Sequence, residues 1–244
     1  MIRYKRKLFN GSLLLFTALL YSCTQERSAK AAVVSARVEA SKIGVGIIAS
    51  GGSAFDAMIA TDLALAVCYP NAGNIAGGGF LVYRTASGEV GSLDYREKAP
   101  LKAFDDMYLD EEGNVIPNKS TLGGLSVGVP GTVAGMFAVH QKFGSLPWNE
   151  LVQPAIDLAR NGYRVTEKQY HSLKSKQKNF IAMNGVETFY AQEFTVGDLV
   201  KNEALAKTLE YIALNGKDGF YRGPVADALV ARVKETGGII NHED

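Results

Sequence analysis

Cysteine and histidine are scarce in this sequence, and their scarcity excludes several kinds of site. The 244 residues contain two cysteines, Cys23 and Cys68, and three histidines, His140, His171 and His242. The histidines stand far apart, without the spacing of zinc ligands, so we expect no metal centre, and nothing indicates a cofactor. Cys68 ends an apolar run, where a thiol usually behaves as a small buried hydrophobe rather than a nucleophile.

An excess of charge of either sign is also missing. The chain has 26 basic and 25 acidic residues, and without the four basic residues among the first seven the balance is 22 to 25. Binding of nucleic acid needs a concentrated basic face, so we expect no nucleic-acid partner. With 47% hydrophobic and 21% charged residues, the composition is that of an ordinary folded protein, long enough to bury a core without disulfides.

The apolar segment at the N-terminus is too short to span a membrane as a helix, which needs roughly 20 residues. Residues 1–7 are basic, residues 13–20 read LLLFTALL, and Leu-Tyr-Ser then leads to Cys23. This pattern predicts a lipoprotein signal peptide over residues 1–22, acylation of Cys23 and a polar tether over residues 23–31. We therefore expect an exported protein, anchored by lipid to the bacterial cell envelope. The alternative is an ordinary secretory signal with a chance cysteine.

Residues 32–244 carry the helix and strand signals of one α/β domain. Residues 32–70 predict a helical stretch broken near Gly51-Gly52, with Ser53 and Asp56 placed for a capping box. After a glycine-rich turn, two segments predict a β-hairpin, residues 80–84 and 91–96. Further helices are expected at residues 130–143, 147–161, 202–215 and 224–236, with a basic helical stretch at 168–178 and a short strand at 239–240.

The last four residues resemble the start of another helix. Asn241 suits an N-cap, and Glu243 and Asp244 are the acidic residues expected in a first turn. We therefore expect the chain to stop in the middle of a longer fold, although an acidic natural terminus would look similar.

Two backbone segments are candidate anion sites. Gly77-Gly78-Gly79 could cradle an anion with its N–H groups, but no Lys-Ser/Thr pair follows, and a tight turn is the simpler interpretation. The helix start at residues 130–132 adds a helix dipole, although most helix starts bind nothing.

Arg96 is the third candidate, because it lies at or near the end of the second strand, where Pro100 ends the pairing and a side chain can point into a cleft. A planar guanidinium matches a carboxylate in bidentate geometry. The alternative is a structural ion pair with Asp94 or Glu97. No Ser-His-Asp order offers a nucleophile in this sequence.

Four motifs in order resemble the gamma-glutamyltransferases, also called glutathione hydrolases: GGSAFDA at 51–57, PNAGNIAGGGF at 70–80, DYREKAP at 94–100 and GVPGTVAG at 128–135. The resemblance covers nearly everything after about residue 32. It implies an N-terminal-nucleophile hydrolase, an α/β fold arranged as an αββα sandwich, of which this chain would be the first part of the large subunit. Such a precursor cuts itself before a threonine, which then heads the small subunit.

That resemblance also implies a reaction and its partners. The threonine attacks the γ-glutamyl amide of glutathione or another γ-glutamyl compound, and the γ-glutamyl-enzyme passes the group to water or an amino acid. Arg96 matches the family arginine that holds the α-carboxylate of the γ-glutamyl group. The sequence ends before the processing threonine, so we expect no catalytic residue within it and no activity without the small subunit.

Two other functions stay open at this point. One is a non-catalytic, lipid-anchored module that binds γ-glutamyl compounds or a protein partner. The other is a related acylase for β-lactam side chains. Arg96 disfavours the acylase, because a side chain without an α-carboxylate would leave the guanidinium unpaired.

Overall fold

Helices make up most of the chain that the structure describes. The computed structural model describes residues 31–244, so the predicted signal peptide, Cys23 and all but the last residue of the predicted tether lie outside the described residues. In chain order the elements are α2 (Val38–Ala49), α3 (Ala54–Cys68), β1 (Phe80–Arg84), β2 (Val90–Asp94), η1 (Gly124–Ser126), α4 (Thr132–Phe143), α5 (Trp148–Asn161), β3 (Tyr163–Arg164), α6 (Glu167–Asn184), η2 (Phe189–Ala191), β4 (Leu199–Val200), α7 (Glu203–Asn215), α8 (Asp218–Tyr221) and α9 (Pro224–Glu235).

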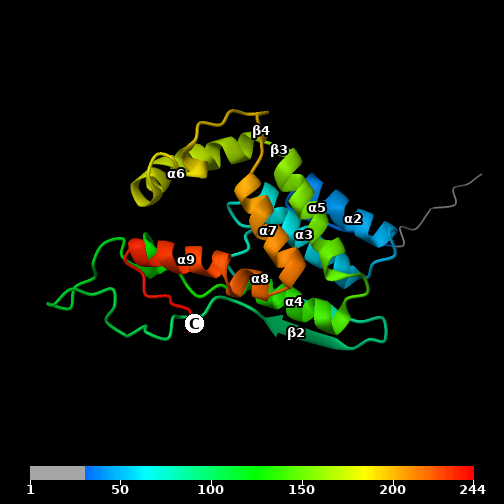
Figure 1. Ribbon diagram of the computed structural model, residues 1–244, viewed down its shortest axis with the longest axis horizontal. Coiled ribbons are helices and arrows are strands. Elements are labelled where there is room, and N and C mark those ends of the chain that lie inside the picture. Colours follow the sequence, from blue (N-terminus) through cyan, green and yellow to red (C-terminus); the bar gives the residue numbers. More distant parts are fainter. Residues whose placement is uncertain (1–30) are drawn as a thin grey trace, which may run out of the picture. The chain divides into compact units, whose positions relative to one another are not determined.

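Helix α3 lies at the centre of the helical core, in contact with α2, α4 and α5 (Figure 1). Its sequence is apolar on almost every face, which predicts burial on several sides at once. Ile59 is fully buried and Leu63 is 1% exposed. Helix α5 turns its apolar side to both α3 and α7, and the indole N–H of Trp148 donates to the carbonyl of Ile212 at 2.9 Å. The core is therefore a stack of helices rather than a sheet.

The predicted capping box at the start of α3 is confirmed. The Ser53 hydroxyl accepts the N–H of Asp56 at 3.1 Å, and the Asp56 carboxylate accepts the N–H of Ser53 at 2.7 Å. Asp56 is fully buried and also binds Ser145 in the α4–α5 loop. Burial alone would raise the pKa of Asp56, but the hydrogen bonds from Ser145 and Ser53 outweigh it and lower that pKa. The cap thus joins α3 to the α4–α5 loop.

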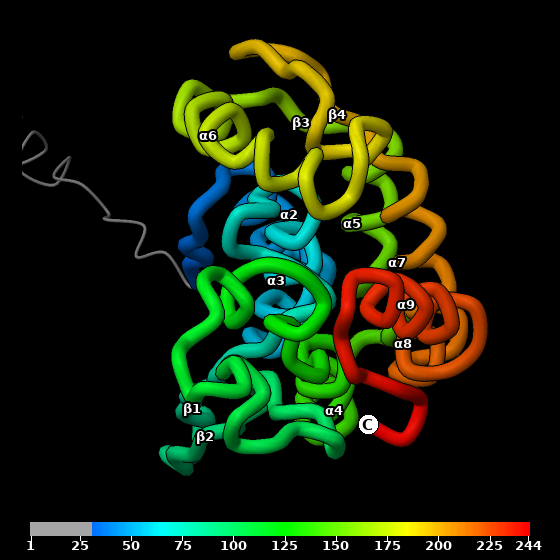
Figure 2. The backbone as a smooth tube through the Cα atoms, turned by 90° about the vertical axis from the view of Figure 1, so that its left-hand side faces the viewer, coloured from blue at the N-terminus to red at the C-terminus, as the bar shows by residue number. Residues whose placement is uncertain are grey.

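The predicted β-hairpin is also present, as the antiparallel pair β1–β2, with Phe80 opposite Asp94 and Arg84 opposite Val90. Side chains alternate between its faces. Leu81 and Leu93 pack against the helical core. Phe80, Val82 and Val90 are 64%, 77% and 67% exposed, so the outward face of the hairpin is uncovered within the described residues. Figure 2 shows the hairpin and α6 at opposite ends of the part of the chain that the structure describes.

The predicted basic helical stretch at 168–178 is confirmed as part of the longer helix α6. Two other parts of the prediction differ from the structure. The first helix begins at Val38 rather than residue 32, because Arg37 is extended and its side chain binds elsewhere. The strand predicted at 239–240 is wrong: this segment pairs with no strand in residues 31–244, and Ile240 is buried against Val129 and Val233 instead.

Candidate functional site

Arg96 lies near the end of a strand, as predicted, although β2 ends two residues earlier, at Asp94. The residues on either side of Arg96 are paired. Tyr95 exchanges hydrogen bonds with Gly79, at 3.0 and 3.4 Å, and Lys98 exchanges them with Val129, at 2.8 and 3.4 Å. The Asp94 carboxylate accepts the backbone N–H of Arg96 at 2.9 Å. The backbone at Arg96 is therefore fixed by its neighbours, while its side chain is exposed.

The Arg96 side chain is available to a ligand. Among residues 31–244 its guanidinium makes no ion pair and no hydrogen bond, so the alternative ion pair with Asp94 or Glu97 is not formed. Arg96 borders an open groove of about 430 Å³. The groove is also lined by residues 97–100, Ala103, Met107, Tyr108 and residues 125–128.

The helix start at residues 130–132 binds the glycine-rich turn instead of an anion. The carbonyl of Gly77 accepts the N–H groups of Gly131 and Thr132, at 2.6 and 3.0 Å, so the start of α4 holds the glycine-rich turn. A Cβ atom on Gly78 would lie 2.6 Å from the Cα of Arg96, and one on Gly131 would collide with the carbonyl oxygen of Tyr95. These glycines therefore allow the backbone around Arg96 to pack closely, which supports the tight-turn interpretation.

Asp62 lies on the core side of the same segment, and the sequence analysis did not single it out as a site residue. Asp62 comes from α3, and its carboxylate makes no hydrogen bond within residues 31–244. Burial raises the pKa of this carboxylate to about 6. The Tyr95 ring packs against the backbone of Gly79 and Gly135. Burial, and then the charge of Asp62, raise the pKa of Tyr95 to about 12. An acidic residue in the middle of a largely apolar stretch of α3 was the sequence signal for this pair.

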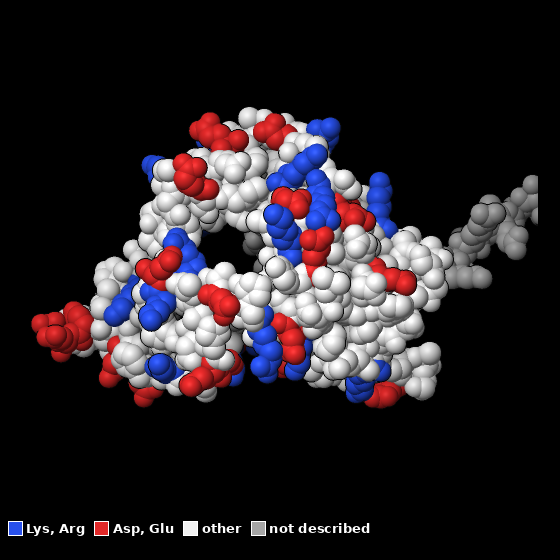
Figure 3. Space-filling model, in the orientation of Figure 1, with Lys and Arg blue, Asp and Glu red and all other residues white. Residues whose placement is uncertain are grey.

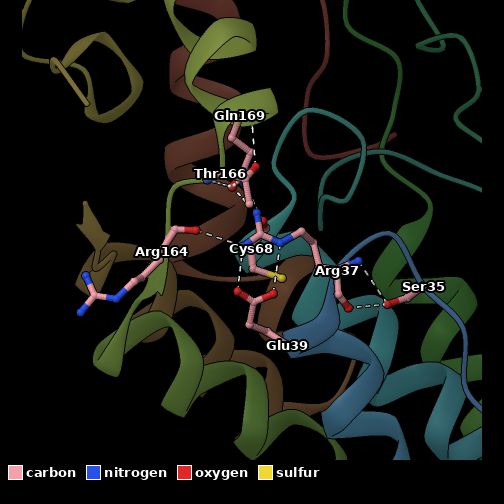
Figure 4. A network of polar contacts seen from close by, with 7 residues as sticks. All are labelled: Ser35, Arg37, Glu39, Cys68, Arg164, Thr166 and Gln169. Atoms are coloured by element: carbon pink, nitrogen blue, oxygen red, sulfur yellow. Dashed lines mark hydrogen bonds and ion pairs between the residues drawn. The ribbon is translucent and has the colours of Figure 1, made fainter. Parts of the chain in front are cut away.

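A second polar cluster surrounds Arg37 at the start of α2 (Figure 4). Its guanidinium donates to both carboxylate oxygens of Glu39, at 3.1 and 2.8 Å, to the carbonyl of Arg164 at 3.1 Å and to the side chain of Gln169. Gln169 in turn donates to the carbonyl of Cys68 at 2.7 Å. Each nitrogen of this guanidinium donates to a partner inside the fold, so the cluster joins α2, α3 and α6 and has a structural role.

The expectation for Cys68 is confirmed. Its thiol is fully buried in the helical core. Burial raises its pKa to about 11, and the nearby charge of Arg37, which sequence order did not reveal, lowers it by less. Such a thiol is not a nucleophile near neutral pH.

The surface of the described residues has mixed charge. Figure 3 shows Lys and Arg side chains alternating with Asp and Glu over one face, rather than collected in one basic patch. In residues 31–244 no helix is both long enough and apolar enough to cross a bilayer. No group of three His, Cys, Asp or Glu in this range is placed to hold a metal ion.

Comparison with known proteins gives consistent matches over most of the chain. The glutathione hydrolase proenzyme of Pseudomonas sp. (strain A14) is 46% identical over 221 residues, which are 87% of this chain and 38% of that protein. The glutathione hydrolase proenzyme of Escherichia coli (strain K12) is 40% identical over 222 residues, 89% of this chain and again 38% of that protein. The chain thus spans well under half the length of these curated relatives.

A solved structure agrees with these sequences. Helicobacter pylori gamma-glutamyltranspeptidase superposes with a TM-score of 0.87 at 43% identity, over 91% of this chain and 64% of that chain. This match confirms the predicted fold class, the large-subunit portion of an N-terminal-nucleophile hydrolase. The family model described as gamma-glutamyltranspeptidase matches residues 40–244. On this agreement of sequence and structure, the chain belongs to the gamma-glutamyltranspeptidase family.

Proposed function

We propose that this chain is the substrate-holding part of an enzyme that cleaves the γ-glutamyl amide of glutathione. The observation that carries the proposal is the exposed guanidinium of Arg96, which has no partner within residues 31–244 and borders a groove at the end of β2. In the motif that resembles the family, this arginine holds the α-carboxylate of the γ-glutamyl group. The enzyme is proposed over the non-catalytic module because the relatives are named as hydrolases.

Arg96 contributes orientation to the reaction. Two parallel N–H donors fix the α-carboxylate in one plane, and this restricts where the γ-amide can lie. Restricting a reactant in this way can supply several kcal/mol of the barrier reduction. The attacking threonine, with its own α-amino group as base, would come from the small subunit, as would the N–H groups that stabilise the oxyanion. The γ-glutamyl group would then pass to water or an amino acid.

The small subunit of the same precursor is the proposed partner, and the outward face of β1–β2 is its proposed contact surface. This face exposes Phe80, Val82 and Val90 within the described residues, and its row of side chains continues toward Arg96. A contiguous exposed apolar patch of this kind usually marks an interface. A γ-glutamyl donor held by Arg96 would then lie beside the junction of the two parts. The 244-residue chain by itself is accordingly proposed to be inactive.

Reassembly tests this proposal. The purified chain and a separately produced nucleophile-bearing part are assayed for release of glutamate from glutathione, alone and mixed. We expect turnover only in the mixture. Val82→Asp should weaken the association about tenfold or more, since it places a charge in an apolar contact, whereas Val38→Asp, at an exposed position on α2, serves as the matched control. Glutamate release by the chain alone, or none by the mixture, would contradict the proposal.

We further propose export to the cell envelope and lipid anchoring at Cys23, which the pattern of basic residues, apolar run and cysteine supports. The test is membrane fractionation and intact mass of the protein expressed in a bacterium. Wild type should carry the lipid and sediment with membranes, and Cys23→Ser should carry none. Cys68→Ala is the matched control. An unmodified Cys23 in the mature wild-type protein would refute the anchor.

A further inference from the structure

Lys98 lines the same groove as Arg96, two positions further along the chain. The backbone around both residues is held by its neighbours, since Tyr95 pairs with Gly79 and Lys98 pairs with Val129. The Asp94 carboxylate also accepts the backbone N–H of Arg96 at 2.9 Å. Two residues of chain separate the Cα atoms of Arg96 and Lys98 by at most about 7 Å.

Both cations lack a partner within residues 31–244 and both border the same groove. Glu97, between them, also lines the groove and has its Cβ close to Gly128. Two hydroxyl groups of the groove are already engaged. The Tyr108 hydroxyl donates to the carbonyl of Leu125 at 3.2 Å, and the Ser126 hydroxyl donates to that of Gly123 at 2.7 Å. The groove therefore offers two unused cationic side chains, with one carboxylate between them in the sequence.

A γ-glutamyl peptide presents two carboxylates to such a pair. One is the α-carboxylate of the γ-glutamyl group, and the other is the C-terminal carboxylate of the peptide released when the γ-amide is cut. Resting on the proposed function, we infer that Lys98 binds the second carboxylate while Arg96 binds the first. Lys98 is then a specificity residue for the leaving group, and the enzyme prefers γ-glutamyl peptides with a free C-terminus.

The strength of this contact depends on what covers the groove. An exposed lysine–carboxylate pair in water is worth little, because solvent screens it. If the second part of the protein closes over the outward face of the hairpin, the effective dielectric constant falls and the attraction grows. We therefore expect a contact of the order of a charge-assisted hydrogen bond, which corresponds to about tenfold in kcat/KM.

The experiment compares two donors in the reassembled two-part enzyme: glutathione, and glutathione with its C-terminal carboxylate converted to an amide. Wild type should prefer the free acid, and Lys98→Gln should reduce this preference about tenfold. Lys98→Arg should restore most of it, and raised salt should weaken it. Lys102→Gln, outside the groove lining, is the matched control. An unchanged preference in Lys98→Gln would overturn the inference.

Arg96→Gln separates this inference from the proposed function. If Arg96→Gln hydrolyses both donors as wild type does, the proposed role of Arg96 fails, whatever Lys98 does. If Arg96→Gln impairs both donors but Lys98→Gln impairs them equally or not at all, only the inference about Lys98 fails. A wild-type mixture without hydrolysis of either donor would overturn both.

Discussion

Arg37 and Arg96 occupy contrasting environments, although both are arginines next to acidic residues in the sequence. Arg37 is 7% exposed and uses its guanidinium on Glu39, Gln169 and a backbone carbonyl. The Arg96 guanidinium is exposed and contacts none of the acidic residues beside it. The difference shows two uses of a charged side chain. It stabilises the fold when its partners lie inside the protein, and it is available to a ligand when only its backbone is held by neighbouring residues.

The two regions also contain carboxylates whose pKa values are shifted in opposite directions. The hydrogen bond from Arg37 lowers the pKa of Glu39, against the effect of burial. Burial raises the pKa of Asp62 to about 6, because no cation or donor within residues 31–244 compensates it. A paired carboxylate favours folding when ionised, and an unpaired one disfavours it. The contrast can therefore be tested by stability measurements on the purified chain, in order of expected effect.

Arg37→Met should have the largest effect, a loss of about 3 kcal/mol in the free energy of unfolding, because it leaves Glu39 and Gln169 without their donor. Urea denaturation measures it. Arg222→Met is the control, since Arg222 is 80% exposed and only 3.6 Å from Asp218 in a loose pair. A loss below about 1 kcal/mol for Arg37→Met would mean that the cluster is not structural.

Asp62→Asn should stabilise the chain by about 1–2 kcal/mol at pH 7.5. The folded-state pKa of Asp62 is about 6, above its ordinary 3.8, so folding favours the protonated form. Its contribution to stability is present below about pH 4 and lost as the pH rises through 6, so the gain in the variant should be small at pH 4 and should grow as the pH rises through 6. The check is unfolding at pH 4 and pH 7.5. A gain that is equal at both values would contradict the unpaired burial of Asp62.

Glu39→Gln should destabilise the chain by about 1 kcal/mol near pH 7, since the charge-assisted hydrogen bonds to Arg37 are lost. The pKa of Glu39 is lowered from its ordinary 4.5, so its contribution is complete above that value and disappears as the pH falls through the folded-state pKa. Denaturation curves at pH 7 and pH 3 should show the difference from wild type shrinking. A difference that grows at low pH would reverse the assigned sign.

Arg96→Gln should have the smallest effect on stability, within about 0.5 kcal/mol, because the side chain makes no ion pair or hydrogen bond in residues 31–244. Thermal unfolding of wild type, Arg96→Gln and Arg37→Met, measured side by side, compares the stability loss of the two variants. Destabilisation of both variants to the same extent would remove the distinction between a structural and a ligand-binding arginine.

Local features were predictable from the sequence. The capping residues Ser53 and Asp56 lie three positions apart, and the first hairpin strand is a short run of residues typical of strands, so each signal lies within a few neighbouring residues. Helices α4 and α5 end at residues 143 and 161, as predicted, because a glycine follows each of them. Arg96 was placed at a strand end for the same local reason.

Contacts between distant residues were not predictable. Arg37 binds Gln169, 132 positions away, and Gly77 binds the start of α4. No local pattern encodes such pairs, because they depend on how the helices pack. The two-residue strands β3 and β4 are too short for any periodicity. The prediction of a strand at 239–240 was wrong for the same reason. The apolar residues there indicated burial, but no strand of the described chain lies beside them to pair with.

Discrimination for the α-carboxylate tests the central claim most directly. Hydrolysis of a γ-glutamyl anilide and of its analogue without the α-carboxylate is measured with the reassembled enzyme, as wild type and as Arg96→Gln. Wild type should favour the carboxylate-bearing donor by at least about a hundredfold in kcat/KM, and Arg96→Gln should lose most of that preference. Equal discrimination by the two proteins would show that Arg96 does not hold the α-carboxylate.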